Sequence, residues 1–144
     1  MTPAELKAQI DAMKANGMVA MFYDPNTVTN IELEKIDTSD WANPPSLKQL
    51  RPAYKASMIE RGDELISDEL VNLPAGDCLH IHAKQTAKNG EWKVGTQLIH
   101  YFVINGSYLY VLSFYTSEKS FDKKDAIFEA VAQSLMFSRG TANT

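Results

Sequence analysis

The chain is short of cysteine, of basic clusters and of long apolar runs. Its only cysteine is Cys78, so no disulfide can form within the chain. The net charge is −4 and no run of Lys and Arg exceeds two residues, whereas binding to nucleic acid or to anionic lipid requires a basic surface. No apolar run approaches the roughly 20 residues of a membrane helix. We therefore expect no nucleic-acid partner and no transmembrane segment.

The common catalytic and nucleotide-binding motifs are also missing from the sequence. It has no glycine-rich dinucleotide fingerprint, no phosphate-binding loop, no Gly-x-Ser-x-Gly elbow, no His-Glu-x-x-His pair and no calcium loop. Each of these chemistries needs its residue types at a fixed spacing, because the spacing brings the side chains to one point of the fold. We expect a protein that is not an enzyme and has no cofactor.

What the sequence does contain is typical of one globular domain. Its 144 residues are 44% hydrophobic and 22% charged, which is enough apolar material for a single core. No internal repeat and no linker divides the chain. We expect one domain over 1–144, with a core over about 3–137 and a frayed tail at 138–144.

Hydrophobic periodicity predicts both helices and strands along the chain. Helices are expected at 3–16, from a capping box at Ser46 to Gly62, and at 122–137 with Asp122 as the N-cap. Pro52 conflicts with the second helix, so we expect a kink there or a start nearer Arg51. Strands are expected at 18–23, 29–36, 65–73, 78–87, 91–104 and 107–116.

Two dipeptides, Asn89-Gly90 and Asn105-Gly106, are typical of two-residue hairpin turns. Such turns fix the register of the strands that they join. The predicted opposing pairs are His82 with Gln97, His80 with Ile99, Leu79 with His100, and Tyr101 with Tyr110. Directly opposed residues share a face of the sheet, so this register decides which side chains lie together.

Both faces of the predicted sheet are apolar. One carries Leu79, Ile81 and Phe102, and the other carries Cys78 and Phe114. A sheet with one solvated face would alternate more regularly between apolar and polar residues, so both faces need a cover, and three amphipathic helices are available. We expect an α+β fold: an α/β/α three-layer sandwich with a mostly antiparallel sheet of about six strands and helices on both faces.

A family resemblance rests mainly on the C-terminal third of the chain. The sequence YLYVLSFYT at 108–116, followed by Phe121 and a helix ending in SLMF at 134–137, is its most specific stretch, and LPAG at 73–76 and MFYDP at 21–25 add to it. With this order of elements, the chain resembles the PsbP/Mog-type family over 18–137. That family includes an extrinsic subunit of photosystem II, a Ran-binding nuclear transport factor and many exported bacterial lipoproteins.

The resemblance implies a sandwich that binds or stabilises partner proteins and has no shared active site. None of the family's partner-binding residues can be matched to a position in this sequence. It also implies a location outside the cytoplasm, with the export signal or lipid anchor removed from this chain; a cytoplasmic location is the alternative.

The stretch Cys78-Leu79-His80-Ile81-His82 is the main candidate for chemistry. Alternate strand residues point the same way, about 6–7 Å apart, so His80 and His82 could hold a metal ion such as zinc or copper. A third ligand is needed, and the predicted register places His100 on the opposite face. Cys78 beside His80 could also form a nucleophile pair. The alternative is an ordinary sheet strand with a buried thiol.

Two further candidates are aromatic. Tyr101 and Tyr110 share a predicted face with His80 and Gln97, and this face is a ligand or partner surface if it is open, or core if a helix covers it. Trp41, in a proline-rich loop, could anchor a partner or could fold back to close one end of the sandwich.

Taken together, the sequence predicts a non-enzymatic protein-binding or accessory domain of a bacterial exported protein or lipoprotein, with an unidentified protein partner. The alternative is a small-ligand or metal-binding protein that uses the face carrying His80, His82 and the tyrosines. The two functions differ in the surface they need, because a ligand carrier needs a concave pocket at that face.

Overall fold

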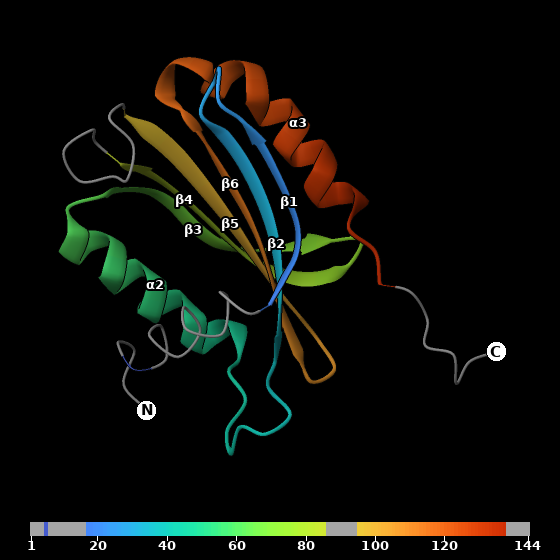
Figure 1. The fold of residues 1–144 in the computed structure, drawn as a ribbon. Helices are drawn as coiled ribbons and strands as arrows, with labels where there is room; N and C mark the ends of the chain where they lie inside the picture. The colour runs from blue at the N-terminus through green and yellow to red at the C-terminus, as the bar shows by residue number, and fades with distance from the viewer. Residues whose placement is uncertain (1–4, 6–16, 86–94, 138–144) are drawn as a thin grey trace.

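The computed structural model describes residues 5, 17–85 and 95–137, and it places them in one open antiparallel sheet with helices on both faces (Figure 1). Of the expected helix at 3–16 only Glu5 is described, and it is helical; the rest of that helix, the turn at 89–90 and the tail at 138–144 lie outside this part of the chain. The strand order is β1-β2-β6-β5-β4-β3. The elements are β1 (Met18–Asp24), β2 (Thr29–Asp37), α2 (Leu47–Arg61), β3 (Glu64–Leu73), β4 (Gly76–Gln85), β5 (Thr96–Asn105), β6 (Tyr108–Ser117), the 3-10 turn η1 (Glu118–Ser120) and α3 (Phe121–Ser134).

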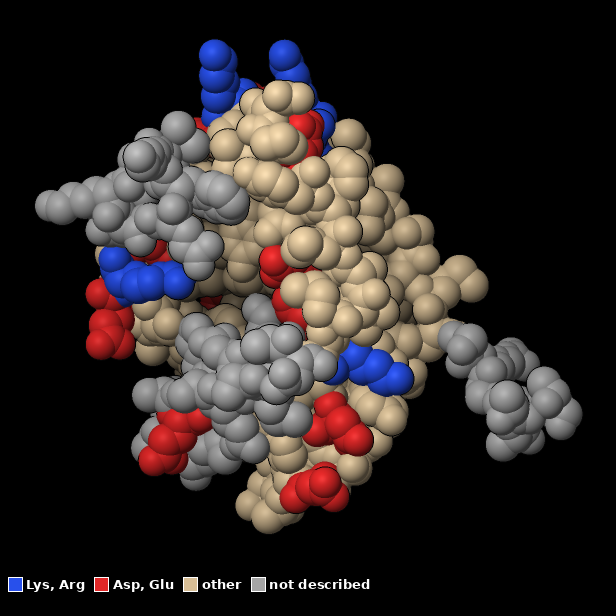
Figure 2. Space-filling view, in the orientation of Figure 1, with Lys and Arg blue, Asp and Glu red and all other residues tan. Residues whose placement is uncertain are grey.

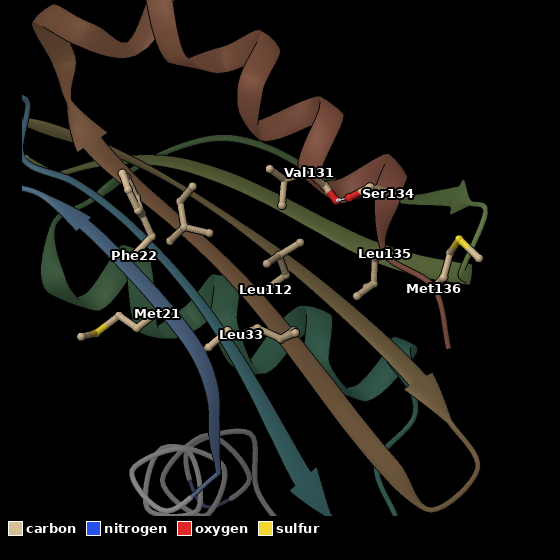
Figure 3. Close-up of a pocket in the computed structure, with 10 residues that line it drawn as sticks. Met21, Phe22, Leu33, Leu112, Val131, Ser134, Leu135 and Met136 are labelled. Carbon is tan, nitrogen blue, oxygen red and sulfur yellow. Dashed lines mark hydrogen bonds between the residues drawn. The ribbon is translucent and has the colours of Figure 1, made fainter. Parts of the chain in front are cut away.

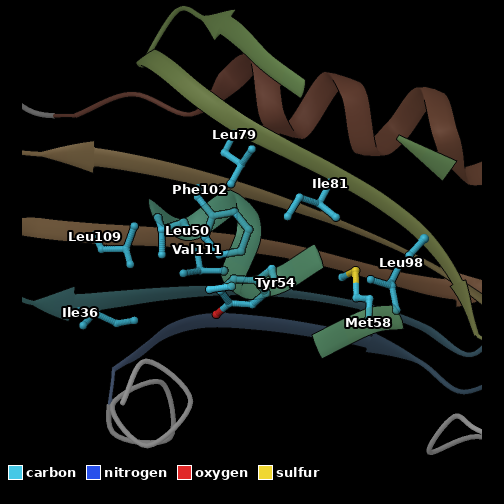
Figure 4. Close-up of a cluster of buried hydrophobic side chains, with 12 residues drawn as sticks. Ile36, Leu50, Tyr54, Met58, Leu79, Ile81, Leu98, Phe102, Leu109 and Val111 are labelled. Atoms are coloured by element: carbon cyan, nitrogen blue, oxygen red, sulfur yellow. The ribbon is translucent and has the colours of Figure 1, made fainter. Parts of the chain in front are cut away.

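The predicted three-layer sandwich is confirmed. α2 packs against β3, β4 and β5, and α3 lies on the other side of the sheet against β6. Each face has its own apolar cluster: Leu50 and Tyr54 of α2 join Leu79, Ile81 and Phe102 in the first (Figure 4). The second cluster joins Phe128 and Ala132 of α3 to Cys78, Ile99, Tyr101, Val103, Leu112 and Phe114.

The predicted hairpin register is wrong by two residues. His80 lies opposite Tyr101 rather than Ile99, and His82 lies opposite Ile99 rather than Gln97. In the second hairpin Tyr101 lies opposite Leu112 rather than Tyr110. A shift of two keeps every side chain on its predicted face, because strand side chains alternate with a period of two.

The second hairpin turns one residue later than expected. Asn105 still pairs with Tyr108, so Gly106 and Ser107 are the turn residues. Gly106 has a φ of +61°. Ser107 does not have positive φ, because Val28 is the only non-glycine residue with positive φ in the described part of the chain. A glycine with positive φ followed by a residue with negative φ is the arrangement of a type II′ hairpin turn.

The second helix begins where its capping box predicts, and Pro52 lies inside it. The Ser46 side chain accepts a hydrogen bond from the backbone N–H of Gln49, whose side chain accepts one from the backbone N–H of Ser46. The alternative start nearer Arg51 is therefore wrong. Burial of Leu50, Tyr54 and two neighbours against the sheet offsets the roughly 3 kcal/mol that an interior proline costs a helix.

The last helix differs from its prediction at both ends. It begins at Phe121, and Ser120 is the N-cap residue without a side-chain cap, so Asp122 lies in the first turn instead. The helix ends at Ser134 rather than 137, because Leu135 adopts an extended backbone. The three residues that leave the helix include Phe137, whose ring packs 4.6 Å from that of Tyr110.

We expect Phe102→Ala to destabilise the fold by about 3–5 kcal/mol, because the side chain is fully buried between sheet and helix. Its ring centroid lies 4.5 Å from that of Tyr54. The control is Ile66→Ala on β3, where 43% of the residue is exposed and the expected loss is within about 1 kcal/mol. Urea unfolding monitored by circular dichroism measures both, and equal losses would contradict this account of the core.

Candidate functional site

The cysteine and two histidines of β4 share one face of the sheet, as predicted, and that face is the one covered by α3. Cys78 is fully buried in the second cluster, and its Sγ lies 3.5 Å from the Leu79 carbonyl oxygen. Burial raises the pKa of the Cys78 thiol to about 12. The thiolate is the reactive form and the metal-binding form of cysteine. At neutral pH Cys78 is therefore a protonated, buried thiol rather than the thiolate that a nucleophile or a metal ligand requires.

The two histidines of β4, His80 and His82, contact different residues. Nε2 of His82 lies 2.7 Å from Oε1 of Gln97, and its ring stacks on Phe121 at 5.0 Å. The His80 ring lies 4.9 Å from that of Tyr101, and its Nδ1 is 3.9 Å from Oε1 of Glu69. Burial lowers the pKa of His80, so its neutral form is favoured in the fold.

His100 lies on the opposite face, as the sequence predicts, and cannot join the other two. Its Nδ1 is 2.8 Å from the Ser113 hydroxyl oxygen, and its ring is 6.0 Å from that of Tyr54 in the α2 layer. Among the described residues no group of three or more His, Cys, Asp and Glu side chains could hold a metal ion. The residues available at His80 and His82 thus fall short of the three protein ligands of a catalytic zinc site.

The predicted aromatic face is covered by α3. Tyr101 is buried, and its hydroxyl lies 3.5 Å from Oε2 of Glu129 on the helix. Gln97 is buried beside the half-buried His82, and Tyr110 is half-buried under Phe137. Four of the predicted site residues, namely His80, His82, Gln97 and Tyr101, therefore come together at the layer between β4–β5 and α3, where side chains fill the space.

Trp41 lies on the other side of the sheet and away from this group. It is half-buried and packs against the cluster under α2. Its backbone N–H donates to the Thr38 carbonyl oxygen at 3.0 Å, which turns the loop back toward the sheet. Trp41 therefore closes one end of the α2 layer rather than standing free in its loop.

An open apolar groove, which the sequence did not predict, lies between the end of α3 and the strands beside it (Figure 3). Its volume is about 410 Å³. We call it the β1–α3 groove, and its lining residues are Ala20, Met21, Phe22, Ile31, Leu33, Leu112, Val131, Ser134, Leu135 and Met136. Ser134 supplies the one polar side chain of this lining, and the groove includes no titratable group.

β1 forms the outer wall of the groove and is an edge strand of the sheet. Its apolar side chains are exposed on both faces: 64% of Met21 and 56% of Phe22 are accessible to solvent. Across the groove, 79% of Met136 is exposed. The surface over the C-terminal half of α3 and the neighbouring strands carries few charged atoms in the space-filling view (Figure 2).

Sequence reasoning missed the groove for a specific reason. A continuous apolar run such as Met18–Tyr23 is typical of a strand buried on both faces, whereas β1 lies at the edge with both faces open. The signal that could have identified the edge strand was the contrast between two segments. Residues 18–23 contain no charged residue, whereas residues 29–36 alternate between apolar and polar side chains.

No helix in the described part of the chain is long and apolar enough to span a bilayer.

We expect the Cys78 thiol to resist a colourimetric disulfide reagent in the folded protein and to react at once in denaturant, because it is fully buried and its pKa is raised. Absorbance of the released thiolate measures the rate in each state. Rapid reaction of the native protein, at a rate near that of the unfolded chain, would argue against a buried thiol.

We expect stability to fall as the pH decreases below about 6.5, in part through His80. Its pKa is lowered in the fold, so the unfolded chain binds a proton first, and the stability held above the unfolded pKa is lost as the pH falls toward the folded one. In His80→Gln this part of the loss should disappear. Urea unfolding between pH 7.5 and 5 measures how the free energy of unfolding depends on pH. The control, Ile66→Ala, should keep the wild-type slope of this dependence. Identical slopes in wild type and His80→Gln would exclude the effect.

The fold is similar to that of proteins already solved over most of the chain. A Pseudomonas aeruginosa protein of unknown function, PA94, proposed to be a regulator, matches with a TM-score of 0.59 and 11% identity over 84% of this chain and 83% of its own. The solution structure of cyanobacterial PsbP from Synechocystis sp. PCC 6803 matches with a TM-score of 0.59 and 15% identity over 84% of this chain and 75% of its own. No protein-family model and no curated protein matches the sequence. At these identities the likeness shows the fold alone: the chain has a PsbP-like α+β sandwich.

Proposed function

We propose that this chain is a non-enzymatic protein-binding or accessory domain of a bacterial exported protein or lipoprotein, and that it holds an apolar segment of its partner in the β1–α3 groove. The PsbP-like fold supports an accessory role, and the location outside the cytoplasm follows from the resemblance to exported bacterial proteins. The observation that carries the proposal is the groove itself, because a large exposed apolar surface on a folded domain marks an interaction site.

The lining of the groove favours binding over catalysis. General acid–base and nucleophilic catalysis need a titratable or nucleophilic side chain at the site. The groove lining offers Ser134, whose hydroxyl lies 2.7 Å from the Val131 carbonyl oxygen and donates to it. The Ser134 hydroxyl donates its proton to a carbonyl oxygen of its own helix, and the groove lining contains no basic side chain that could activate it. The groove therefore offers apolar contact area rather than catalytic groups.

The shape of the groove favours a polypeptide segment over a small molecule. Small-molecule sites bury most of their ligand in a closed pocket, whereas Met21, Phe22 and Met136 leave the rim of this groove exposed. Methionine side chains are flexible and polarisable and adapt to different apolar partners. A groove of this kind suits the apolar side chains of an extended or helical segment, which enter it while the segment's backbone stays near solvent.

We expect short peptides selected from a phage-displayed library against this domain to be rich in Leu, Ile, Met and Phe and to bind in the groove. Met136→Glu should weaken the selected peptide at least about tenfold, which is about 1.4 kcal/mol, because the new carboxylate must be desolvated on binding. Fluorescence anisotropy of the labelled peptide measures the affinity.

The matched control for this test is Ile59→Glu, since Ile59 is an exposed apolar residue (58%) of α2 on the other side of the sheet. Its affinity should equal that of wild type, and circular dichroism should show that both variants fold. A library that yields no specific peptide, or peptides that bind Met136→Glu as tightly as wild type, would refute the groove as the docking surface.

A further inference from the structure

The β1–α3 groove continues along β2 and β6 into an aromatic strip at one of its ends. Lys35 follows Leu33 by two residues on β2 and lies opposite Tyr110 of β6, just as Leu33 lies opposite Leu112. Residues two apart on a strand point the same way, about 6–7 Å apart, and opposed residues share a face. Phe137, which follows the last residue of the groove lining, packs its ring 4.6 Å from that of Tyr110. Lys35 and Tyr110 therefore lie on the groove side of the sheet, next to the lining.

Lys35 is the cation of this strip. Its Nζ lies 4.1 Å from the centroid of the Tyr108 ring, which is 6.3 Å from that of Tyr110. The side chain of Lys35 is exposed, and none of the ion pairs seen among the described residues includes it. Lys84, by contrast, pairs with Glu118 at 3.1 Å. An aromatic face attracts a cation without neutralising it, so Lys35 can pair with an anion that a partner brings.

We propose that the polypeptide segment held in the groove carries a Glu or Asp side chain beside its apolar residues, and that this carboxylate pairs with Lys35. This inference deepens the proposed function and rests on it, because it specifies the chemistry of the partner at the same groove. Apolar side chains of the segment lie against Leu33 and Leu112. In an extended segment the acidic residue then follows or precedes them by about two positions, which is the spacing between Leu33 and Lys35.

The charges around the groove favour one carboxylate at one position. The groove lining contains no charged residue, and the chain as a whole has a net charge of −4, so an acidic segment is repelled in general and attracted at Lys35. Asp37 lies two residues beyond Lys35, opposite Tyr108 on the same face. Hydrogen bonds from Ser39 lower the pKa of Asp37, so this carboxylate is charged at neutral pH. The carboxylate of the partner must therefore approach Lys35 from the groove and not from the side of Asp37.

The test uses the peptides selected from the phage-displayed library, made synthetically with an amidated C-terminus so that their only carboxylates are in side chains. We expect an Asp or Glu at a fixed position beside the apolar residues. Lys35→Gln should weaken such a peptide about two- to fivefold, which is the range of an exposed ion pair. It should leave unchanged the affinity for the same peptide in which the acidic residue is replaced by its amide. Fluorescence anisotropy of the four combinations measures the coupling between the two charges.

Three further variants separate pairing at this position from a general effect of charge. Lys35→Arg should keep the affinity of the wild type, since it keeps the cation. Asp37→Asn should tighten binding of the acidic peptide, because a like charge near Lys35 is removed. The matched control is Lys48→Gln on α2, an exposed lysine on the other side of the sheet. It makes the same change in net charge as Lys35→Gln and should not alter the affinity, and circular dichroism should show that all the variants fold.

The outcomes distinguish this inference from the proposed function. Groove peptides that lack an acidic residue, or an acidic peptide that binds wild type and Lys35→Gln equally, would overturn the pairing with Lys35 and leave the groove in place. Equal losses in Lys35→Gln and Lys48→Gln would overturn it as well, since they would show an effect of net charge alone. A library that yields no peptide for the groove would overturn the proposed function and this inference with it.

Discussion

The antiparallel pairing of β4, β5 and β6 is the constraint on which the rest of the structure depends. Their side chains are apolar on both faces, so the sheet is stable only if both faces are covered. α2 covers β3 to β5 on one side, and α3 covers β6 on the other. In the described part of the chain the residues of β1 from Met18 to Tyr23 stay exposed, and an open groove lies between β1 and α3.

The same constraint decides the fate of the residues that suggested chemistry. A strand in the middle of a covered sheet sends alternate side chains into two separate cores, so β4 and β5 send His80 and His82 to one layer and His100 to the other. Burial then favours the neutral forms of Cys78 and His80. The reactive-looking stretch of the sequence is thereby packed between the sheet and α3, and the proposed docking groove lies elsewhere.

The surface that remains open is made from distant parts of the chain. Phe22 comes from the first strand and Met136 from the segment after the last helix, and they line one groove because β6 lies next to β2 and α3 packs against β6. Its outer wall, β1, is exposed from Met18 to Tyr23. This exposed strand therefore underlies the proposed docking site.

The sequence by itself determined the elements and their faces. Capping residues such as Ser46 and Gly62 bounded α2, and the period of two assigned Cys78 and Phe102 to opposite layers even though the hairpin register was wrong by two, because a shift of two preserves every face. Only the tertiary structure decided which strand lies at the edge, where α3 ends, and that residues 20–22 and 131–136 enclose a groove. Periodicity is a local property of the chain, whereas strand order and the placement of helices depend on contacts between residues far apart in sequence, which the pattern of any one segment does not contain.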